Sequence, residues 1–188
     1  LERVAVDDPE LLRRLEAFVA EELPFLNARL ELCPKPALRD LAEEFDRALS
    51  PRVRLRCGGY ICVEETEALT AVDVNTGSFV GSEDLEQTAL RTNLEAAREI
   101  ARQLRIRNIG GLIAIDFIDL RKESHRQQVL RVLRESLRSD RMRTKVVGMS
   151  PLGVVELTRK RSGEPLRRAA CQPCPTCGGL GYVRSSEV

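Results

Sequence analysis

Hydrophobic and polar residues recur along the chain with two periods, that of a helix and that of a strand. The helical period predicts four amphipathic helices, at residues 7–23, 37–49, 82–108 and 125–140. The first of them opens on Asp8 and Pro9, a favourable cap and first position. The third is expected to stop at Asn108 and Gly110.

Runs rich in β-branched residues lie between these helices and are expected to form one sheet. They cover residues 60–65, 68–74, 111–120, 143–150 and 153–161, with strand-like sequence also before 60. The first two runs are joined by a short polar link, which is typical of a hairpin. The run 111–120, GLIAIDFIDL, is apolar enough to predict a central strand buried on both faces. Strands alternating with helices predict an α/β fold, in the form of an α+β mixed sheet flanked by helices.

Length and composition fit one large domain, or a domain with a small appendage. The 188 residues are 43% hydrophobic, which is enough for a core. From about Ser162 the chain is rich in Pro, Gly and Cys and is expected to be a separate element. Nothing approaches the ~20 apolar residues of a membrane span, so we expect a cytoplasmic protein. Because the chain begins at Leu1 rather than Met, we expect it to be a fragment of a longer protein.

The charges nearly cancel, giving a net charge of +1, which excludes a basic nucleic-acid-binding tail. A local basic surface is still possible in such a protein. Nearly all the positive charge is arginine, which suits bidentate recognition of phosphate. Arginine usage of this kind also follows from codon bias in a GC-rich genome.

Acidic and amide side chains stand inside two of the apolar runs. Asp73 and Asn75 lie in TAVDVNTG, and Asp116 lies in LIAIDFI. If the two strands are neighbours, both carboxylates reach one rim of the sheet, where ligands bind in α/β folds. Carboxylates beside an amide form the all-oxygen site that Mg²⁺ prefers. Alternatively, these residues only stabilise turns at strand ends, which is the role expected for Asp119.

Cysteines are clustered near the end of the chain. Cys171, Cys174 and Cys177 form C-x₂-C-x₂-C before a Gly-rich turn, a spacing that suits Zn²⁺. Three cysteines leave a structural zinc one ligand short, so another chain is expected to complete the site; free thiols are the alternative. His125 is expected to be a surface or capping residue. The remaining cysteines are expected to be small core residues: Cys33, Cys57 and Cys62.

Four longer stretches together resemble the bacterial ribonuclease E/G family. They are GGYICVEETEALTAVDVNTGSFVG, TNLEAAREIARQLRIRNIGGLIAIDFIDL, DRMRTKVVGMSPLGVVELTRKR and CPTCGGLG. The resemblance runs from about Leu55 to about Val183, and the VDVNTGSFVG form with the extra cysteine is more similar to the ribonuclease G branch. It implies an Mg²⁺-dependent endoribonuclease of rRNA and mRNA processing and decay. Such an enzyme cuts single-stranded RNA by attack of metal-activated water and leaves a 5′-phosphate.

The resemblance also implies roles for individual residues. Asp73 and Asp116 match the aspartates that hold the catalytic Mg²⁺, and Asn75 matches the asparagine that supports the attacking water or the scissile phosphate. Arg143 matches a position linked to catalysis. Cys174 and Cys177 match the pair that shares one Zn²⁺ with a second protomer, which implies a homo-oligomer, with Cys171 as an alternative ligand or a bystander.

Three parts of the family architecture are implied as well. Residues 1–54 resemble the helical tail of a ribonuclease H-like subdomain, residues 55–165 a deoxyribonuclease I-like catalytic subdomain, and residues 166–188 a zinc-link segment. The family's oligonucleotide-binding barrel is not visible, and aromatic residues make up only 4% of the chain. A competing hypothesis is therefore a non-catalytic, zinc-linked RNA-binding or assembly module. Two inward carboxylates argue against it, because they repel phosphate unless a cation intervenes.

Overall fold

The computed structural model describes residues 2–25, 29–33, 39–77, 85–150 and 152–185. It divides into two compact units, Leu1–Arg47 and Ala48–Val188. In chain order the elements are β1 (Arg3–Val6), α1 (Pro9–Glu22), β2 (Arg29–Leu32), α2 (Arg39–Leu49), β3 (Arg52–Arg54), β4 (Tyr60–Glu65), β5 (Thr70–Asn75), α3 (Leu85–Ile106), β6 (Gly111–Asp116), α4 (Glu123–Leu137), β7 (Thr144–Met149), β8 (Val154–Arg159) and α5 (Leu166–Ala170).

The first unit contains a parallel pair of short strands, β1 and β2, with the helix α1 between them in sequence. The predicted start of α1 is confirmed, because the Asp8 carboxylate accepts hydrogen bonds from the N–H groups of Glu10 and Leu11, each at 2.8 Å. The strand pair was not predicted from the sequence. Each strand has only four residues, which is too short a run for a period-2 pattern to predict a strand.

The second unit is built on a six-stranded mixed sheet in the order β3-β4-β5-β6-β8-β7. Only the pair β5–β6 is parallel, and every other neighbouring pair is antiparallel. The β4–β5 hairpin and the strands β7 and β8 were predicted correctly. Strand β3 belongs to this sheet through its pairing with β4.

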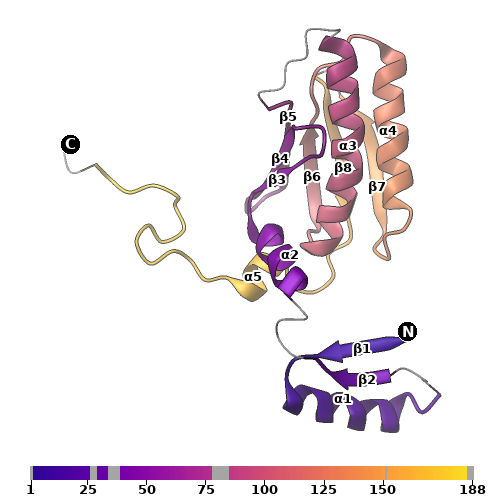
Figure 1. Cartoon of the computed structure of the whole chain (residues 1–188). Coiled ribbons are helices and arrows are strands. Elements are labelled where there is room, and N and C mark those ends of the chain that lie inside the picture. The colour runs from indigo at the N-terminus through magenta and orange to yellow at the C-terminus, as the bar shows by residue number, and fades with distance from the viewer. Residues whose placement is uncertain (1, 26–28, 34–38, 78–84, 151, 186–188) are drawn as a thin grey trace. The chain divides into compact units, whose positions relative to one another are not determined.

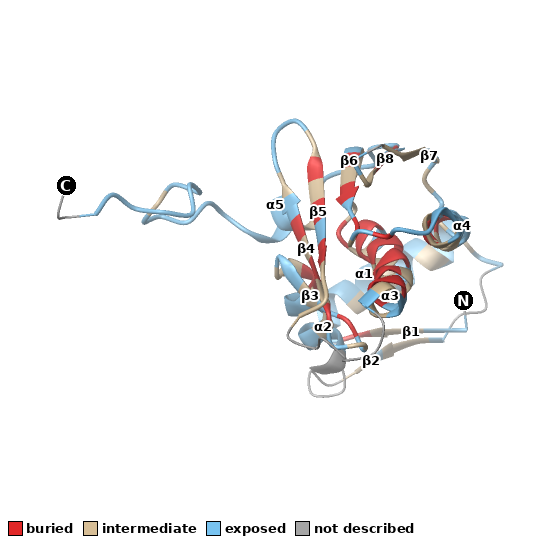
Figure 2. Ribbon diagram, turned by 90° about the horizontal axis from the view of Figure 1, so that it is seen from above, coloured by how far each residue is buried: buried red, intermediate tan, exposed pale blue. Residues whose placement is uncertain are grey.

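Helices α3 and α4 pack side by side on one face of this sheet (Figure 1). Buried positions gather between the helices and the sheet, as Figure 2 shows for β4, β5, β6 and α3. In helix α4 the buried residues share one face of the helix and are Val129, Leu130, Leu133 and Leu137. Helix α3 ends near the expected stop, where Asn108 adopts a positive φ of 51°. The predicted starts of α3 and α2, at residues 82–84 and 37–38, lie outside the described residues.

Strand β6 corrects one prediction. It lies in the interior of the strand order, but only one of its faces is buried. Ile113 and Ile115 point toward the helices and are fully buried, whereas Leu112 on the other face is 45% exposed. The prediction of burial on both faces is wrong because both long helices of this unit lie on the same side. The second face of the sheet, called here the open face, therefore carries the alternate side chains of each strand.

Candidate active site

Asp73 and Asp116 are direct partners in the parallel ladder between β5 and β6. The residues that flank Asp73, Val72 and Val74, are buried toward the helices, and Ile115 is buried in the same way before Asp116. Because side chains alternate along a strand, both aspartates point to the open face, and both are exposed. Neighbouring strands lie about 4.8 Å apart, so the two carboxylates stand side by side where both strands end.

Asn75 completes this group from the same strand. Its side-chain Nδ2 donates a hydrogen bond of 2.7 Å to Oδ2 of Asp73. The amide thus orients one carboxylate while its own carbonyl oxygen remains a potential ligand. Two carboxylates and an amide are a donor set that fits Mg²⁺, which binds one or two protein carboxylates and keeps several waters. Among the described residues no group of three or more His, Cys, Asp or Glu side chains gathers as a metal cage.

A buried asparagine of α3 holds the chain segment that leaves β6. Asn93 is 0% exposed, and its Nδ2 donates to the carbonyl oxygen of Ile118 at 2.7 Å. The N–H of Ile118 in turn donates to Oδ1 of Asn93 at 3.0 Å. These two hydrogen bonds resemble those between neighbouring strands, and they hold the backbone two residues after Asp116. Asn93 was not predicted from the sequence, although an asparagine within the apolar stripe of a helix was a visible signal.

Glu86 holds the following residues of the same segment. Its carboxylate accepts hydrogen bonds from the N–H groups of Arg121 and Lys122 at 3.0 and 3.2 Å, and lies 2.8 Å from Nδ1 of His125. The Arg121 N–H is the main cause that lowers the pKa of Glu86 to about 2, and Lys122 and His125 add to it. His125 is not a free surface residue, since its side chain is only 14% exposed. Asn93 and Glu86 together fix the connection between β6 and α4.

Two glycines allow a turn to approach the end of β5 closely. A Cβ at Gly59 would lie 2.5 Å from the carbonyl oxygen of Asn75 and 2.9 Å from a side-chain carbon of Thr92. Gly77 has a φ of +69°, and a Cβ there would lie 2.5 Å from the carbonyl oxygen of Gly58. Any larger residue would therefore push the backbone at the end of β5 out of place.

Arg143 is not brought together with the acidic pair. It precedes β7, whose first residue Thr144 pairs with Arg159, and Arg159 pairs with Gly111 at the start of β6. Asp116 lies at the other end of β6, five residues further along, which corresponds to about 17 Å at the rise of a strand. The structure thus separates the expected catalytic arginine from the aspartates by the length of the sheet.

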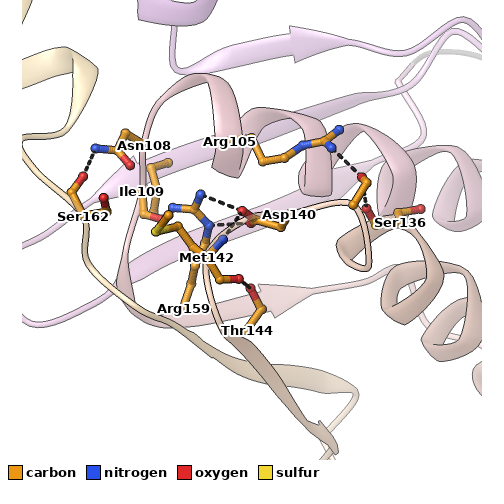
Figure 3. Close-up of polar contacts among 10 residues, drawn as sticks. Arg105, Asn108, Ile109, Ser136, Asp140, Met142, Thr144, Arg159 and Ser162 are labelled. Carbon is orange, nitrogen blue, oxygen red and sulfur yellow. Dashed lines mark hydrogen bonds and ion pairs between the residues drawn. The ribbon is translucent and has the colours of Figure 1, made fainter. Parts of the chain in front are cut away.

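The buried charged groups at that end of the sheet stabilise the fold. Figure 3 shows Arg159 of β8 meeting Asp140 of the α4–β7 connection, with a distance of 2.7 Å from Nε to Oδ2. Both side chains are almost completely buried, and Arg159 also donates to the carbonyl oxygen of Ile109 at 2.7 Å. Burial by itself raises the pKa of Asp140, but hydrogen bonds from Arg159 and from the Met142 N–H bring it below its ordinary value.

The cysteines fall into different environments. Cys57 packs against the core of the second unit, as expected, and Cys33 is half-buried. Cys62 is not a core residue, because it pairs with Asp73 across β4 and β5 and so lies on the open face. The alternation of buried Ile61 and Val63 decides this placement, which the isolated sequence run did not reveal.

The C-terminal cysteines surround a tight turn. Cys171 and Cys174 are exposed and Cys177 is half-buried. The backbone N–H groups of Cys177 and then Thr176 lower the pKa of the Cys174 thiol, which favours the thiolate that metals bind. The N–H of Gly181 donates to Sγ of Cys177 at 3.4 Å. Within the described part of the chain, these cysteines do not form a three-ligand metal group by themselves.

An exposed aspartate pair with an amide beside it, on the open face of a mixed sheet, is typical of proteins that act on phosphates through a divalent cation. The chain belongs to the ribonuclease E/G family, since the model of that family matches residues 1–162. None of the helices in the described ranges is long and apolar enough to cross a membrane.

Named relatives align over much or all of the chain. Ribonuclease G of Escherichia coli (strain K12) is 46% identical over 192 aligned residues, and ribonuclease G of Salmonella typhimurium (strain SL1344) is equally similar. Both alignments cover the whole chain but only 39% of the relative. Ribonuclease E of Synechocystis sp. (strain PCC 6803) is 53% identical over 136 residues, 72% of this chain and 20% of the relative. The chain thus spans about two-fifths of the length of its ribonuclease G relatives.

Proposed function

We propose that the protein is an endoribonuclease that cleaves single-stranded RNA with the help of Mg²⁺, and that Asp73 and Asp116 hold this ion. The single observation that carries the proposal is the register of the β5–β6 ladder, which makes the two aspartates direct neighbours on an exposed face. Membership of the ribonuclease E/G family supports RNA as the substrate. The processing and decay of rRNA and mRNA are the corresponding roles, and the cytoplasm is the corresponding location.

The chain's own residues would act as follows. Bound Mg²⁺ would supply charge neutralisation at the phosphate and a lower pKa for water. Asn75 holds the Asp73 carboxylate through the 2.7 Å hydrogen bond and so fixes the orientation of that ligand. Asn93 and Glu86 hold the segment after Asp116 and limit the movement of the second ligand. Attack of water on phosphorus with cleavage of the P–O3′ bond leaves a 5′-phosphate on the downstream product and a 3′-hydroxyl upstream.

The test is cleavage of a short single-stranded RNA carrying a 5′-monophosphate, in the presence of Mg²⁺, by the full-length protein and its variants. Asp73→Asn and Asp116→Asn should each lower kcat on the order of 100-fold or more, as expected when charge stabilisation at the reacting phosphate is removed. Glu156→Gln is the matched control, because Glu156 is an exposed acid on the same open face, beside Ala114 of β6. Full activity of Asp73→Asn would leave the binding or assembly module as the better description.

We propose further that Cys174 and Cys177 hold Zn²⁺ together with the same pair of a second copy, with Cys171 as an alternative ligand. The support is the lowered pKa of Cys174 and the absence of a three-ligand group within the described residues of one chain. The double variant Cys174→Ser/Cys177→Ser should lose its zinc and dissociate, as followed by elemental analysis and light scattering. Cys33→Ser is the control. An unchanged mass in the double variant would refute the link.

We propose that the chain is divided according to the family's architecture. We assign residues 55–165 to a deoxyribonuclease I-like catalytic subdomain and residues 1–54 to the end of a ribonuclease H-like one, followed by the zinc-link segment 166–188. In support, the strands that carry Asp73 and Asp116 lie within the second compact unit.

A further inference from the structure

The open face carries an aromatic and two basic side chains next to the acidic pair. Tyr60 of β4 pairs with Asn75 of β5, and Cys62 pairs with Asp73. Because Ile61 is fully buried toward the helices, Tyr60 lies on the open face, one diagonal step from Asp73. Diagonal neighbours of this kind have their side chains about 7–8 Å apart, a distance that an aromatic ring or its ligand can span.

Two arginines of the edge strand β3 share this part of the face. Arg54 pairs with Tyr60, and Arg52 pairs with Cys62, so both point to the open face. Both are exposed, while Val53 between them packs against the core. The guanidinium carbon of Arg52 lies 4.4 Å from the centre of the Tyr60 ring, a cation–π contact that stacks the two groups. The result is a stacked, positively charged platform beside two carboxylates.

This combination distinguishes a single-stranded nucleic acid from other partners. Every base has a π-face, so a ring stacked with a guanidinium binds bases without reading their sequence. Exposed arginines attract phosphates, whereas Asp73 and Asp116 repel them unless a cation lies between. A single-stranded nucleic acid that crosses the open face is thus held over β3 and β4, where its bases stack and its phosphates meet the arginines. It presents one phosphate to the acidic pair.

We propose that Tyr60 and Arg52, with Arg54 beside them, form the platform on which the nucleotide next to the scissile phosphate stacks. This inference rests on the proposed function, which puts the scissile phosphate at Asp73 and Asp116. It adds the residues that position the RNA at that site. It also supplies a stacking contact from within this chain, which contains only two tyrosines, Tyr60 and Tyr182.

Binding of a fluorescent, 5′-monophosphorylated single-stranded RNA of mixed sequence is the measurement, by anisotropy, with Mg²⁺ and in an Asp73→Asn background that prevents cleavage. Tyr60→Ala and Arg52→Ala should each weaken binding about 5- to 100-fold, the range expected for loss of one stacked base. Tyr60→Phe should bind within about 2-fold of its parent, because it keeps the ring that stacks. The matched controls are Tyr182→Ala and Arg98→Ala, at exposed positions outside the open face, and they should bind like the parent.

A second arm identifies the contact as stacking. RNAs with one base removed are compared at each position in turn. At one position the loss caused by base removal and the loss caused by Tyr60→Ala should not add, since both remove the same contact. Circular dichroism confirms the fold of each variant. Arg52→Ala decides the matter if Tyr60→Ala does not fold, because Arg52 is an exposed edge-strand residue.

The outcomes separate this inference from the proposed function. Parent-like binding of folded Tyr60→Ala, or of Arg52→Ala, would overturn the platform even if Asp73→Asn abolishes cleavage. Weakened binding in both variants together with undiminished cleavage by Asp116→Asn would support the platform and refute the proposed role of the aspartates. Additive losses at every abasic position would also overturn the platform, because the ring would then not touch a base.

Discussion

Asp73 and Asp116 pair directly across the only parallel contact in the six-stranded sheet. In a parallel pair both strands run in the same direction, so their carboxyl ends coincide and two side chains meet there on one face. The neighbours β4 and β8 run antiparallel to β5 and β6, so they begin, rather than end, at this edge of the sheet. The position of the acidic pair is thus a consequence of the crossover through α3, which connects β5 to β6.

This pairing predicts how stability should respond to Mg²⁺. Two like charges on neighbouring strands destabilise the sheet, and a bound cation removes the repulsion. We expect Mg²⁺ to raise the melting temperature of the parent protein by thermal scanning, and EDTA to lower it again. Asp73→Asn should melt about 1–4 °C higher than the parent without Mg²⁺ and respond little to the ion. A parent-like response to Mg²⁺ in Asp73→Asn, with Glu156→Gln as control, would contradict the assigned site.

The hydrogen bonds between Asn93 and Ile118 predict that replacing Asn93 will lower both the stability of the fold and the affinity of the proposed Mg²⁺ site. Asn93→Ala leaves the N–H and carbonyl groups of Ile118 without their buried partner, and should cost about 2–4 kcal/mol of unfolding free energy in urea. In the protein that remains folded, more Mg²⁺ should be needed for half-maximal cleavage, because the segment after Asp116 is released. Arg98→Ala, a change at an exposed position of α3, is the control. If Asn93→Ala lowers stability but leaves the Mg²⁺ requirement unchanged, Asn93 supports only the fold.

The position of Arg143 predicts a defect in binding rather than in the chemical step. It lies about 17 Å along the sheet from Asp116, too far to touch the same phosphate as the aspartates. Arg143→Ala should raise KM for long single-stranded RNA and leave kcat within about 2-fold of the parent, the pattern of lost uniform binding. With RNA too short to reach that end of the sheet the effect should vanish. A fall in kcat with short RNA would instead place Arg143 at the reacting phosphate.

The buried pair Arg159–Asp140 predicts a pH-dependent contribution to stability. Since the pKa of Asp140 is lowered in the folded protein, the contribution is fully present above the unfolded value near 4. It is lost as the pH falls through the folded value. Asp140→Asn should cost about 3–5 kcal/mol at pH 7, because Arg159 then stays buried without its counter-charge. Urea titrations of both proteins should converge as the pH falls below the unfolded value near 4. A constant difference would show that the charge is not the cause.

Local sequence patterns identified most elements of the second unit. Helix α4 and the β4–β5 hairpin follow from apolar spacing and turn chemistry, which act over a few residues. The same patterns missed β1 and β2, whose pairing joins residues far apart in sequence. They also predicted, wrongly, that both faces of β6 are buried. An apolar run shows that a strand is hydrophobic, but not whether helices cover one face of the sheet or both.

The candidate site shows the same division. The sequence by itself determined that Asp73, Asn75 and Asp116 interrupt apolar strands, a choice of residues that local folding does not require. Only the tertiary structure decided that the two aspartates are register partners, that Tyr60 and Cys62 share their face, and that Arg143 lies at the opposite end of the sheet. Register and strand order arise from packing between distant segments, and a one-residue shift would move every one of these side chains to the other face.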